Sequence, residues 1–204
     1  MAHLRTVLLV KGCASLEDYI HRYCEYYAVF KGHEGVRPNT LSPVGDALIA
    51  PALKSNLKTS LTYISSLMSH NFGGTLAVAA EAYQIRCAVA HNGGVIDSET
   101  ARRLPKFAKQ LGKRILLPWE QLLLYLGGID KIAQQIDLTI PQRALSRIEA
   151  RWLIQDSVDG NKKITANEIR HRLANSFGIK SMPSAREISV EFSVPEGAKI
   201  VAKE

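Results

Sequence analysis

The sequence predicts a mainly α-helical protein, with a helical bundle over residues 1–136 and an extension of helices and a β-hairpin over residues 137–204. Apolar residues recur every three to four positions through most of the chain, which is the period of an amphipathic helix. Near the end, residues 187–194 (EISVEFSV) alternate strictly between polar and apolar, which is the period of a strand. This change of period is the reason for expecting a hairpin in the extension.

The first half of the chain is predicted to contain three helices and one long loop. The helices cover residues 16–30, 53–69 and 75–91, and the loop covers residues 31–52. Ser15 followed by Asp18 has the spacing of a capping box, which favours a helix start there. The loop is rich in proline and glycine. The third helix is expected to end at Asn92-Gly93, where a left-handed residue is accessible.

The second half continues the helical pattern with shorter elements. A short helix is expected to be capped by Asp97 or Ser98 and interrupted by Pro105, and a strand is expected over 113–117. Helices are expected over 118–136 and 141–155. A last helix begins at the capping box of Thr165 and Glu168 and ends at Gly178. Gly127-Gly128 marks a point where the helix over 118–136 can break. After residues 187–194, the turn residues 195–197 and the run 198–201 predict the return strand of the hairpin.

The composition excludes several classes of protein. Of the 204 residues, 46% are hydrophobic and 22% are charged, which is ordinary for a soluble globular protein. No apolar run approaches the roughly 18 residues that a membrane span needs, so no membrane partner is expected. The three cysteines are an odd number without CxxC spacing, which argues against a disulfide framework or a structural zinc site. We therefore expect a cytoplasmic protein in a reducing compartment.

The charge is concentrated in one half of the chain. Residues 1–100 hold eight basic and eight acidic residues, whereas residues 101–204 hold 18 and 11, so the net charge of +7 comes from the second half. Between residues 101 and 114 the chain has basic residues and no acidic ones; these are Arg102, Arg103, Lys106, Lys109, Lys113 and Arg114. Such a patch is typical of a protein that binds a polyanion, although a solvated helix face is the simpler interpretation.

The stretch IRCAVAHNGGVID (residues 85–97) contains the best candidates for catalysis. The planar guanidinium of Arg86 matches phosphate oxygens, and His91 can give and take protons near neutral pH. Together they suit phosphodiester chemistry without a metal. In the alternative interpretation, the histidine only favours the helix dipole and the arginine is a surface residue.

The same stretch resembles the HEPN superfamily, which comprises small helical domains found in many bacterial toxins and phage-defence proteins. Their hallmark is Arg-x4-6-His near the end of a helix, often followed by a turn. Here Arg86, the spacing, His91 and the turn at Asn92-Gly93 fit that form, and so does the earlier acidic helix LEDYIHRYCEYY. Cys87 stands where the family usually has Asn or another polar residue. The resemblance covers roughly residues 10–136.

The resemblance implies a metal-independent endoribonuclease of toxin or phage-defence type that needs no cofactor. His91 would be the acid and base, and Arg86 would stabilise the phosphate. The residues expected to bind the RNA are Asn92, Arg102, Arg103, Lys106 and Lys109. The expected partners are RNA, a second copy of the chain, and an antitoxin or another defence-system protein.

The spacing of Arg86 and His91 also bears on the number of chains in a site. Five positions along a regular helix turn by about 140° net, so the two side chains converge only if the helix ends between them or a second copy completes the cleft. RNA cleavage requires a base that takes the proton of the 2′-hydroxyl and an acid that protonates the leaving 5′-oxygen, whereas each chain offers one well-placed histidine. We therefore expect a homodimer with both copies of Arg86 and His91 in one groove.

Two other functions stay open. The chain can be a catalytically silent HEPN-like module that binds nucleic acid or a partner protein. It can also be a DNA-binding regulator that uses residues 141–194, because ITANEIRHRLANSFGIKS (164–181) followed by an alternating strand loosely resembles a winged helix-turn-helix.

Overall fold

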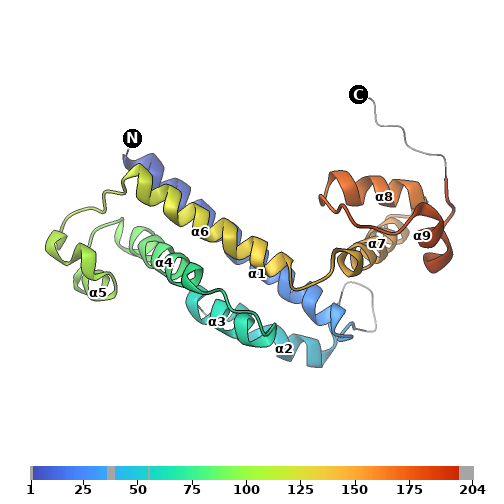
Figure 1. Ribbon diagram of the computed structural model, residues 1–204, viewed down its shortest axis with the longest axis horizontal. Helices are drawn as coiled ribbons and strands as arrows, with labels where there is room; N and C mark the ends of the chain where they lie inside the picture. The colour runs from blue at the N-terminus through green and yellow to red at the C-terminus, as the bar shows by residue number, and fades with distance from the viewer. Residues whose placement is uncertain (1, 36–39, 55, 198–204) are drawn as a thin grey trace. The chain divides into compact units, whose positions relative to one another are not determined.

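The computed structural model describes residues 2–35, 40–54 and 56–197, and their regular secondary structure is helical (Figure 1). The helices are α1 (Ala2–Phe30), α2 (Pro43–Leu53), α3 (Leu57–Leu67), α4 (Gly74–Asn92), α5 (Ser98–Arg103), the 3-10 helix η1 (Pro105–Gln110), α6 (Trp119–Asp137), α7 (Gln142–Asp159), α8 (Ala166–Asn175) and α9 (Ala185–Phe192). Within the described residues there is no strand, and two isolated bridges join Glu34 to Leu41 and Val95 to Arg114. The prediction of a mainly α protein is therefore confirmed, whereas the strand over 113–117 is wrong.

None of these helices, as far as the chain is described, combines the length and the apolar composition needed to cross a bilayer.

The chain divides into two compact units. The first combines Met1–Cys24 with Ala50–Thr139, and the second combines Glu25–Ile49 with Ile140–Glu204. The first unit contains α3, α4, α5, η1 and α6 together with most of α1, and the second contains α7, α8 and α9.

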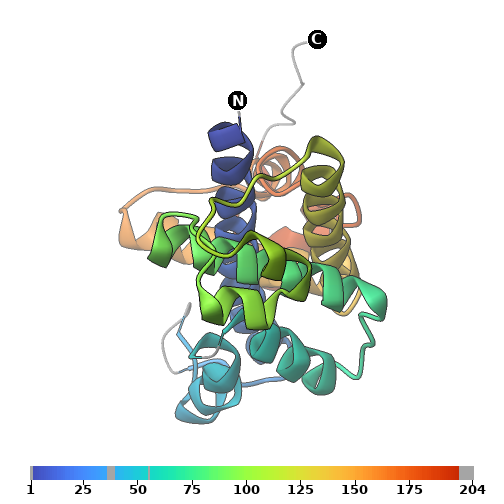
Figure 2. The same ribbon diagram turned by 90° about the vertical axis from the view of Figure 1, so that its left-hand side faces the viewer.

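In the first unit, α4 is the helix against which most neighbours pack. It contacts α3, α5 and α6, and Figures 1 and 2 show it lying across α1 and α6. Its buried residues are Ala79, Ala82, Ile85 and Ala88, and the small alanines allow neighbouring helices to approach closely. Helix α1 lies along α6 (Figure 1), and near the end of α6 the hydroxyl of Tyr19 donates to Asp137 and lies 3.4 Å from the carbonyl oxygen of Ala133. This packing leaves α4 with few exposed positions.

The second unit has its own apolar core between α7, α8 and α9. The core residues are Ala150, Ile164, Ala166, Ile169, Leu173, Ile179, Ala185 and Ile188. Helix α8 begins with the predicted capping box of Thr165 and Glu168, which is confirmed. Helix α9 begins with a second capping box, formed by Ser184 and Glu187. The unit is thus a small helical module in which side chains satisfy the free N–H groups at two helix starts.

The predicted strand over 187–194 is wrong, because α9 covers most of it. Ile188 is fully buried and Phe192, four positions later, is partly buried against the same core, whereas Val190 between them is 76% exposed. The alternating pattern therefore contains a helical stripe with a spacing of four, and the capping box selects the helix. The return strand predicted for 198–201 lies outside the described residues.

Three further predictions in the first half are corrected. Helix α1 begins at Ala2, so Ser15 and Asp18 lie inside a helix and form no cap at its start. Part of the predicted loop is helix α2, which Pro43 can begin because its fixed φ suits the first helical position. Helix α6 runs unbroken through Gly127-Gly128.

The two neighbouring glycines of α6 differ in what an added methyl group would meet. A Cβ at Gly127 would meet open space, whereas a Cβ at Gly128 would lie 2.6 Å from Cγ1 and 3.2 Å from Cβ of Val78 on α4. Gly127→Ala should stabilise the protein by about 0.5–1 kcal/mol through helix propensity. Gly128→Ala should instead destabilise it by about 1 kcal/mol, because overpacking outweighs that gain. Urea denaturation followed by circular dichroism measures both changes, and equal effects of the two substitutions would contradict the close packing of α4 on α6.

Candidate functional site

The end of α4 is joined tightly to the start of α5. The backbone N–H of Gly94 donates to the carbonyl of Ala88 over 3.1 Å, and Gly93 takes the left-handed conformation predicted for this turn. Asp97 then caps α5 by accepting from the backbone N–H of Thr100 over 2.7 Å. The same carboxylate accepts from the side-chain amide of Asn92 over 2.6 Å. The hydrogen bond from the Thr100 backbone, followed by the other bonds to this carboxylate, holds the pKa of Asp97 below its ordinary value. The turn therefore carries a fixed negative charge.

His91 lies exposed in the last turn of α4, on the side that faces α5. It lines a cavity of about 330 Å³ together with Cys87, Asn92, Asp97 and Arg103. The cavity thus places a proton-transfer group beside a guanidinium and a carboxylate. A negatively charged phosphate entering it would meet both an attractive and a repulsive group.

Arg86 lies on another side of α4 and does not line this cavity. Its guanidinium is 3.3 Å from a carboxylate oxygen of Glu17 on α1 and lies 5.4 Å from the centre of the Tyr83 ring. Partial burial disfavours the charged guanidinium, but Glu17, Cys87 and Tyr83 outweigh this and raise the pKa of Arg86. Arg86 is therefore a fixed cation whose position depends on α1.

The separation of Arg86 and His91 follows from the continuity of α4. Because the helix is unbroken to Asn92, the two side chains are turned by about 140° from each other around its axis. The sector between them holds Tyr83, Cys87 and Ala90, which are half-buried or exposed. We call these five residues the α4 strip. One chain therefore presents Arg86 and His91 at the two edges of one accessible strip, and not as a converging pair.

The predicted basic patch around α5 is partly neutralised by two glutamates, Glu99 and Glu81. Glu99 pairs with Arg103 over 2.5 Å and lies 3.8 Å from Arg102, so one carboxylate serves two guanidinium groups. Lys106 pairs with Glu81, and its ammonium donates to the hydroxyl of the fully buried Tyr125 over 2.5 Å. Partial burial opposes the charge of Lys106, but these two partners raise its pKa.

The predicted nucleic-acid residues therefore divide by location. Asn92 and Arg103 share the cavity of His91, whereas Arg102, Lys106 and Lys109 lie outside it. Lys109 is exposed and forms no ion pair with any described residue. Lys106 supports the packing of Tyr125, so among the cations predicted to bind nucleic acid outside the cavity, Lys109 is the most available to a ligand, followed by Arg102, which lies 3.8 Å from Glu99.

Two acidic residues of the site could not be identified individually from the sequence. Glu17 belongs to the acidic amphipathic helix that also suggested the family resemblance, but nothing in that segment shows which of its acidic residues meets Arg86. Glu99 precedes Arg102 and Arg103 by three and four positions, and residues with this spacing share a helix face. This spacing is the one sequence signal for the pairing. Among the described residues, no three His, Cys, Asp or Glu side chains gather in a way that could hold a metal ion.

Comparison with known proteins returns no relative. No family model, no curated protein and no solved structure matches the chain.

Cys87 in the α4 strip and the nearby Cys13 of α1 should differ in the reactivity of their thiols. Burial raises the pKa of Cys13 to about 12, and the nearby carboxylate of Glu17 adds to the shift. At about pH 8, Cys13 should therefore stay protonated and unreactive, while the half-exposed Cys87 is accessible to iodoacetamide. Peptide mass spectrometry of the briefly alkylated native protein should find the label on Cys87. In a guanidinium-unfolded control both should react, and equal labelling of Cys13 in the native protein would contradict its burial.

Proposed function

We propose that this protein is a metal-independent endoribonuclease of the toxin or phage-defence type, acting in the cytoplasm. The observation that carries the proposal is the α4 strip, which presents an exposed histidine at a helix end and an arginine that is paired with Glu17. Histidine supplies proton transfer near neutral pH, and arginine supplies a lasting positive charge for a phosphate. Two copies of each side chain would supply the base, the acid and the positive charge that cleavage by the RNA's own 2′-hydroxyl requires.

The proposed reaction forms one bond at phosphorus and breaks another. The 2′-oxygen attacks the adjacent phosphorus while a neutral imidazole of His91 takes the 2′-hydroxyl proton. The bond from phosphorus to the 5′-oxygen breaks, and a protonated imidazole gives that oxygen a proton. The products are a 2′,3′-cyclic phosphate and a 5′-hydroxyl, and each proton transfer contributes about 10²–10⁴-fold to the rate.

Arg86 is proposed to stabilise the negative charge that develops on the phosphate oxygens. Its guanidinium can offer paired N–H donors to two such oxygens, and in a partly dry site such bonds are stronger than in water. Glu17 takes one side of the guanidinium and so fixes its orientation. We therefore assign Glu17 a positioning role.

The complete site is proposed to form in a homodimer. The reaction needs a base and an acid at the same time, and one α4 strip has a single histidine. A two-fold axis through the strip would bring two copies of His91 and Arg86 into one groove, and Ala90 in the strip leaves room for a close approach. Arg102 and Lys109 are proposed to guide the RNA toward this groove. An antitoxin or another defence-system protein is the partner proposed to restrain the activity in the cell.

A second function is favoured by one observation. Arg86 is already paired with Glu17 and lies outside the cavity of His91, which suits a catalytically silent module that binds nucleic acid or a partner protein. The two functions differ in one measurable way, because the silent module would bind RNA without cleaving it.

Substitution at the two edges of the α4 strip tests the ribonuclease function. His91→Ala and Arg86→Ala should each reduce RNA cleavage in EDTA at least 10²-fold, since each removes a group that acts in the transition state. The matched controls are His21→Ala and Arg22→Ala, which remove exposed side chains of the same types from α1. Cleavage is measured on labelled RNA, with circular dichroism to confirm folding. Full activity in either strip variant would exclude the assignment, and binding without cleavage by the wild type would favour the silent module.

A further inference from the structure

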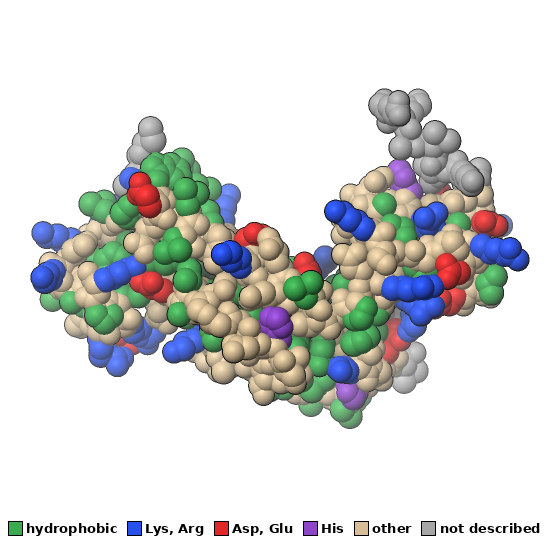
Figure 3. Space-filling view, in the orientation of Figure 1, with side chains coloured by type: hydrophobic (Ala, Val, Ile, Leu, Met, Phe, Trp, Pro, Cys, Tyr) green, Lys and Arg blue, Asp and Glu red, His purple; other side chains and the backbone are tan. Residues whose placement is uncertain are grey.

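The second unit carries a groove that the proposed ribonuclease site does not use. It has a volume of about 630 Å³ and lies between α8 and the start of α9. Arg170 and His171 of α8 line one part of it, and Ser184 and Arg186 line another. Glu196 is the one acidic residue among the described residues of its lining. Figure 3 shows lysine, arginine and histidine side chains on the surface of this unit.

One wall of the groove is held in place by hydrogen bonds to its backbone carbonyl groups. Residues 195–197 lie against the first turn of α8, where the backbone N–H of Ala166 donates to the carbonyl of Pro195 over 2.9 Å. The side-chain amide of Asn167 donates to the carbonyls of Glu196 and Gly197 over 2.9 and 2.8 Å. Gly197 has a φ of +73°, and a Cβ there would lie 2.6 Å from Cβ of Thr165. The wall is therefore built without using either arginine of the groove.

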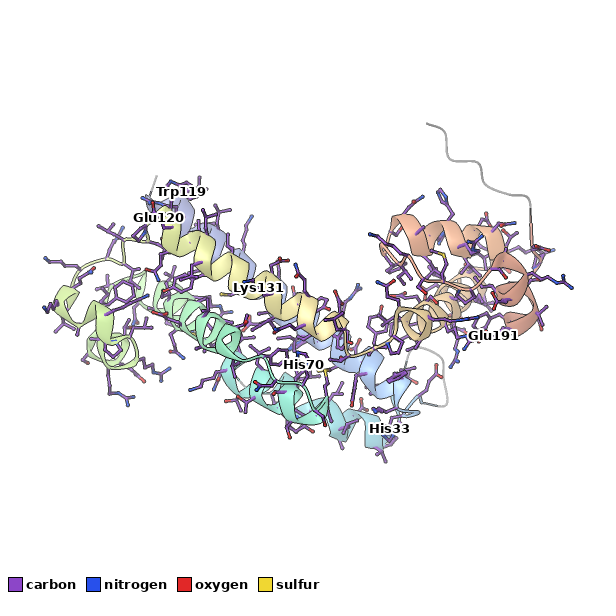
Figure 4. The ribbon with its side chains drawn as sticks, in the orientation of Figure 1. His33, His70, Trp119, Glu120, Lys131 and Glu191 are labelled. Carbon is purple, nitrogen blue, oxygen red and sulfur yellow. The ribbon has the colours of Figure 1, made fainter. Side chains whose placement is uncertain are left out.

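The glutamates of α9 are paired with arginines of α7. Glu187 pairs with Arg143 of α7 over 2.6 Å, and Glu191, labelled in Figure 4, pairs with Arg147 over 3.1 Å. Arg186 lines the groove and also a smaller pocket that it shares with Glu187 and Glu191, but it forms no ion pair with a described residue. The glutamates of α9 are thus neutralised by α7, whereas Arg186 is not neutralised.

The cations of the groove have no acidic partner among the residues that the structure describes. Arg170 and Arg186 are both exposed, and neither forms an ion pair there. Residues 160–190 contain six lysines and arginines but only two glutamates. Both glutamates are engaged, because Glu168 and Glu187 each accept hydrogen bonds at a helix start. Residues 160–190 therefore hold more cations than acidic groups that could pair with them.

We propose that this groove is a second nucleic-acid-binding surface, which holds the phosphodiester backbone of a nucleic-acid strand. Arg170 and Arg186 contact phosphate oxygens, for which the guanidinium geometry is suited. A strand that leaves the groove meets further exposed cations of the unit, which are Lys162, Lys163, Arg172 and Lys180. A polymer with a negative charge at every nucleotide can use such distributed cations, whereas a single small anion cannot. The surface is independent of His91 and would bind nucleic acid whether or not the chain cleaves RNA.

Two matched double variants test the proposal on the full chain in a His91→Ala background, in which RNA stays intact. Arg170→Gln with Arg186→Gln removes the free arginines, and Arg143→Gln with Arg147→Gln removes two paired arginines from the same unit. Fluorescence anisotropy is measured with probes of about 20 nucleotides as single-stranded RNA, duplex RNA and duplex DNA. The groove variant should bind its preferred probe roughly tenfold more weakly than the parent, with a salt slope lower by about two. The control variant should change affinity less than about twofold, because its arginines are already neutralised.

A charge change of opposite sign gives a second readout that does not depend on the arginine variants folding. Glu196→Gln removes the carboxylate from the groove lining and should strengthen binding of the same probe. Equal weakening by both double variants would show that only net charge matters and would overturn the proposal. It would also be overturned if none of the three probes bound, or if Glu196→Gln left the affinity unchanged. Binding of polyglutamate in place of nucleic acid would identify an acidic protein partner and contradict the proposal.

Discussion

The geometry of the candidate site depends on the continuity of one helix, α4. Helix α4 packs against α3, α5 and α6, contacts α1 through Arg86, and stays helical to Asn92 before Gly93 turns the chain. Regular helix geometry then fixes Arg86 and His91 about 140° apart, whatever the chemistry requires. Besides a pocket lined by Leu76, Ala77 and Ala80 nearer its start, α4 leaves the strip between Arg86 and His91 accessible to a partner or a substrate. A site that uses both residues at one phosphate is consequently easier to build from two chains than from one.

Ion pairing decides which of the many cations can bind a polyanion. Positive charge is abundant in the second half of the sequence, but Lys106 is committed to Glu81 and Tyr125, and Arg103 is committed to Glu99. In the second unit Arg143 and Arg147 of α7 are paired with α9, while Arg170 and Arg186 form no ion pair with a described residue. A surface pair of this kind contributes little to stability, yet it lowers the charge available to a ligand. Net charge alone therefore overstates the binding surface of this protein.

The helical class and several helix ends could be predicted from the sequence, because local signals determine them. The capping box at Thr165 and the turn at Gly93 require only residues within one helical turn, and both are present. The prediction was wrong where one pattern fits two periods, as for Ile188 and Phe192 in α9. It was also wrong at Ser15, where a capping motif lies inside a longer helix that tertiary packing maintains. The partner of Arg86 could not be predicted, since Glu17 reaches it through packing of helices far apart in the chain.

The central claim is that the α4 strips of two chains form one catalytic groove, and subunit mixing tests it most directly. Wild-type chains are equilibrated with a ninefold excess of His91→Ala chains, and an inert protein replaces the variant in the control. Wild-type pairs then make up about one hundredth of all dimers, so cleavage per wild-type chain should fall about tenfold relative to the control. Cleavage strictly proportional to the amount of wild-type chain, or an active monomer at the working concentration, would contradict the shared groove.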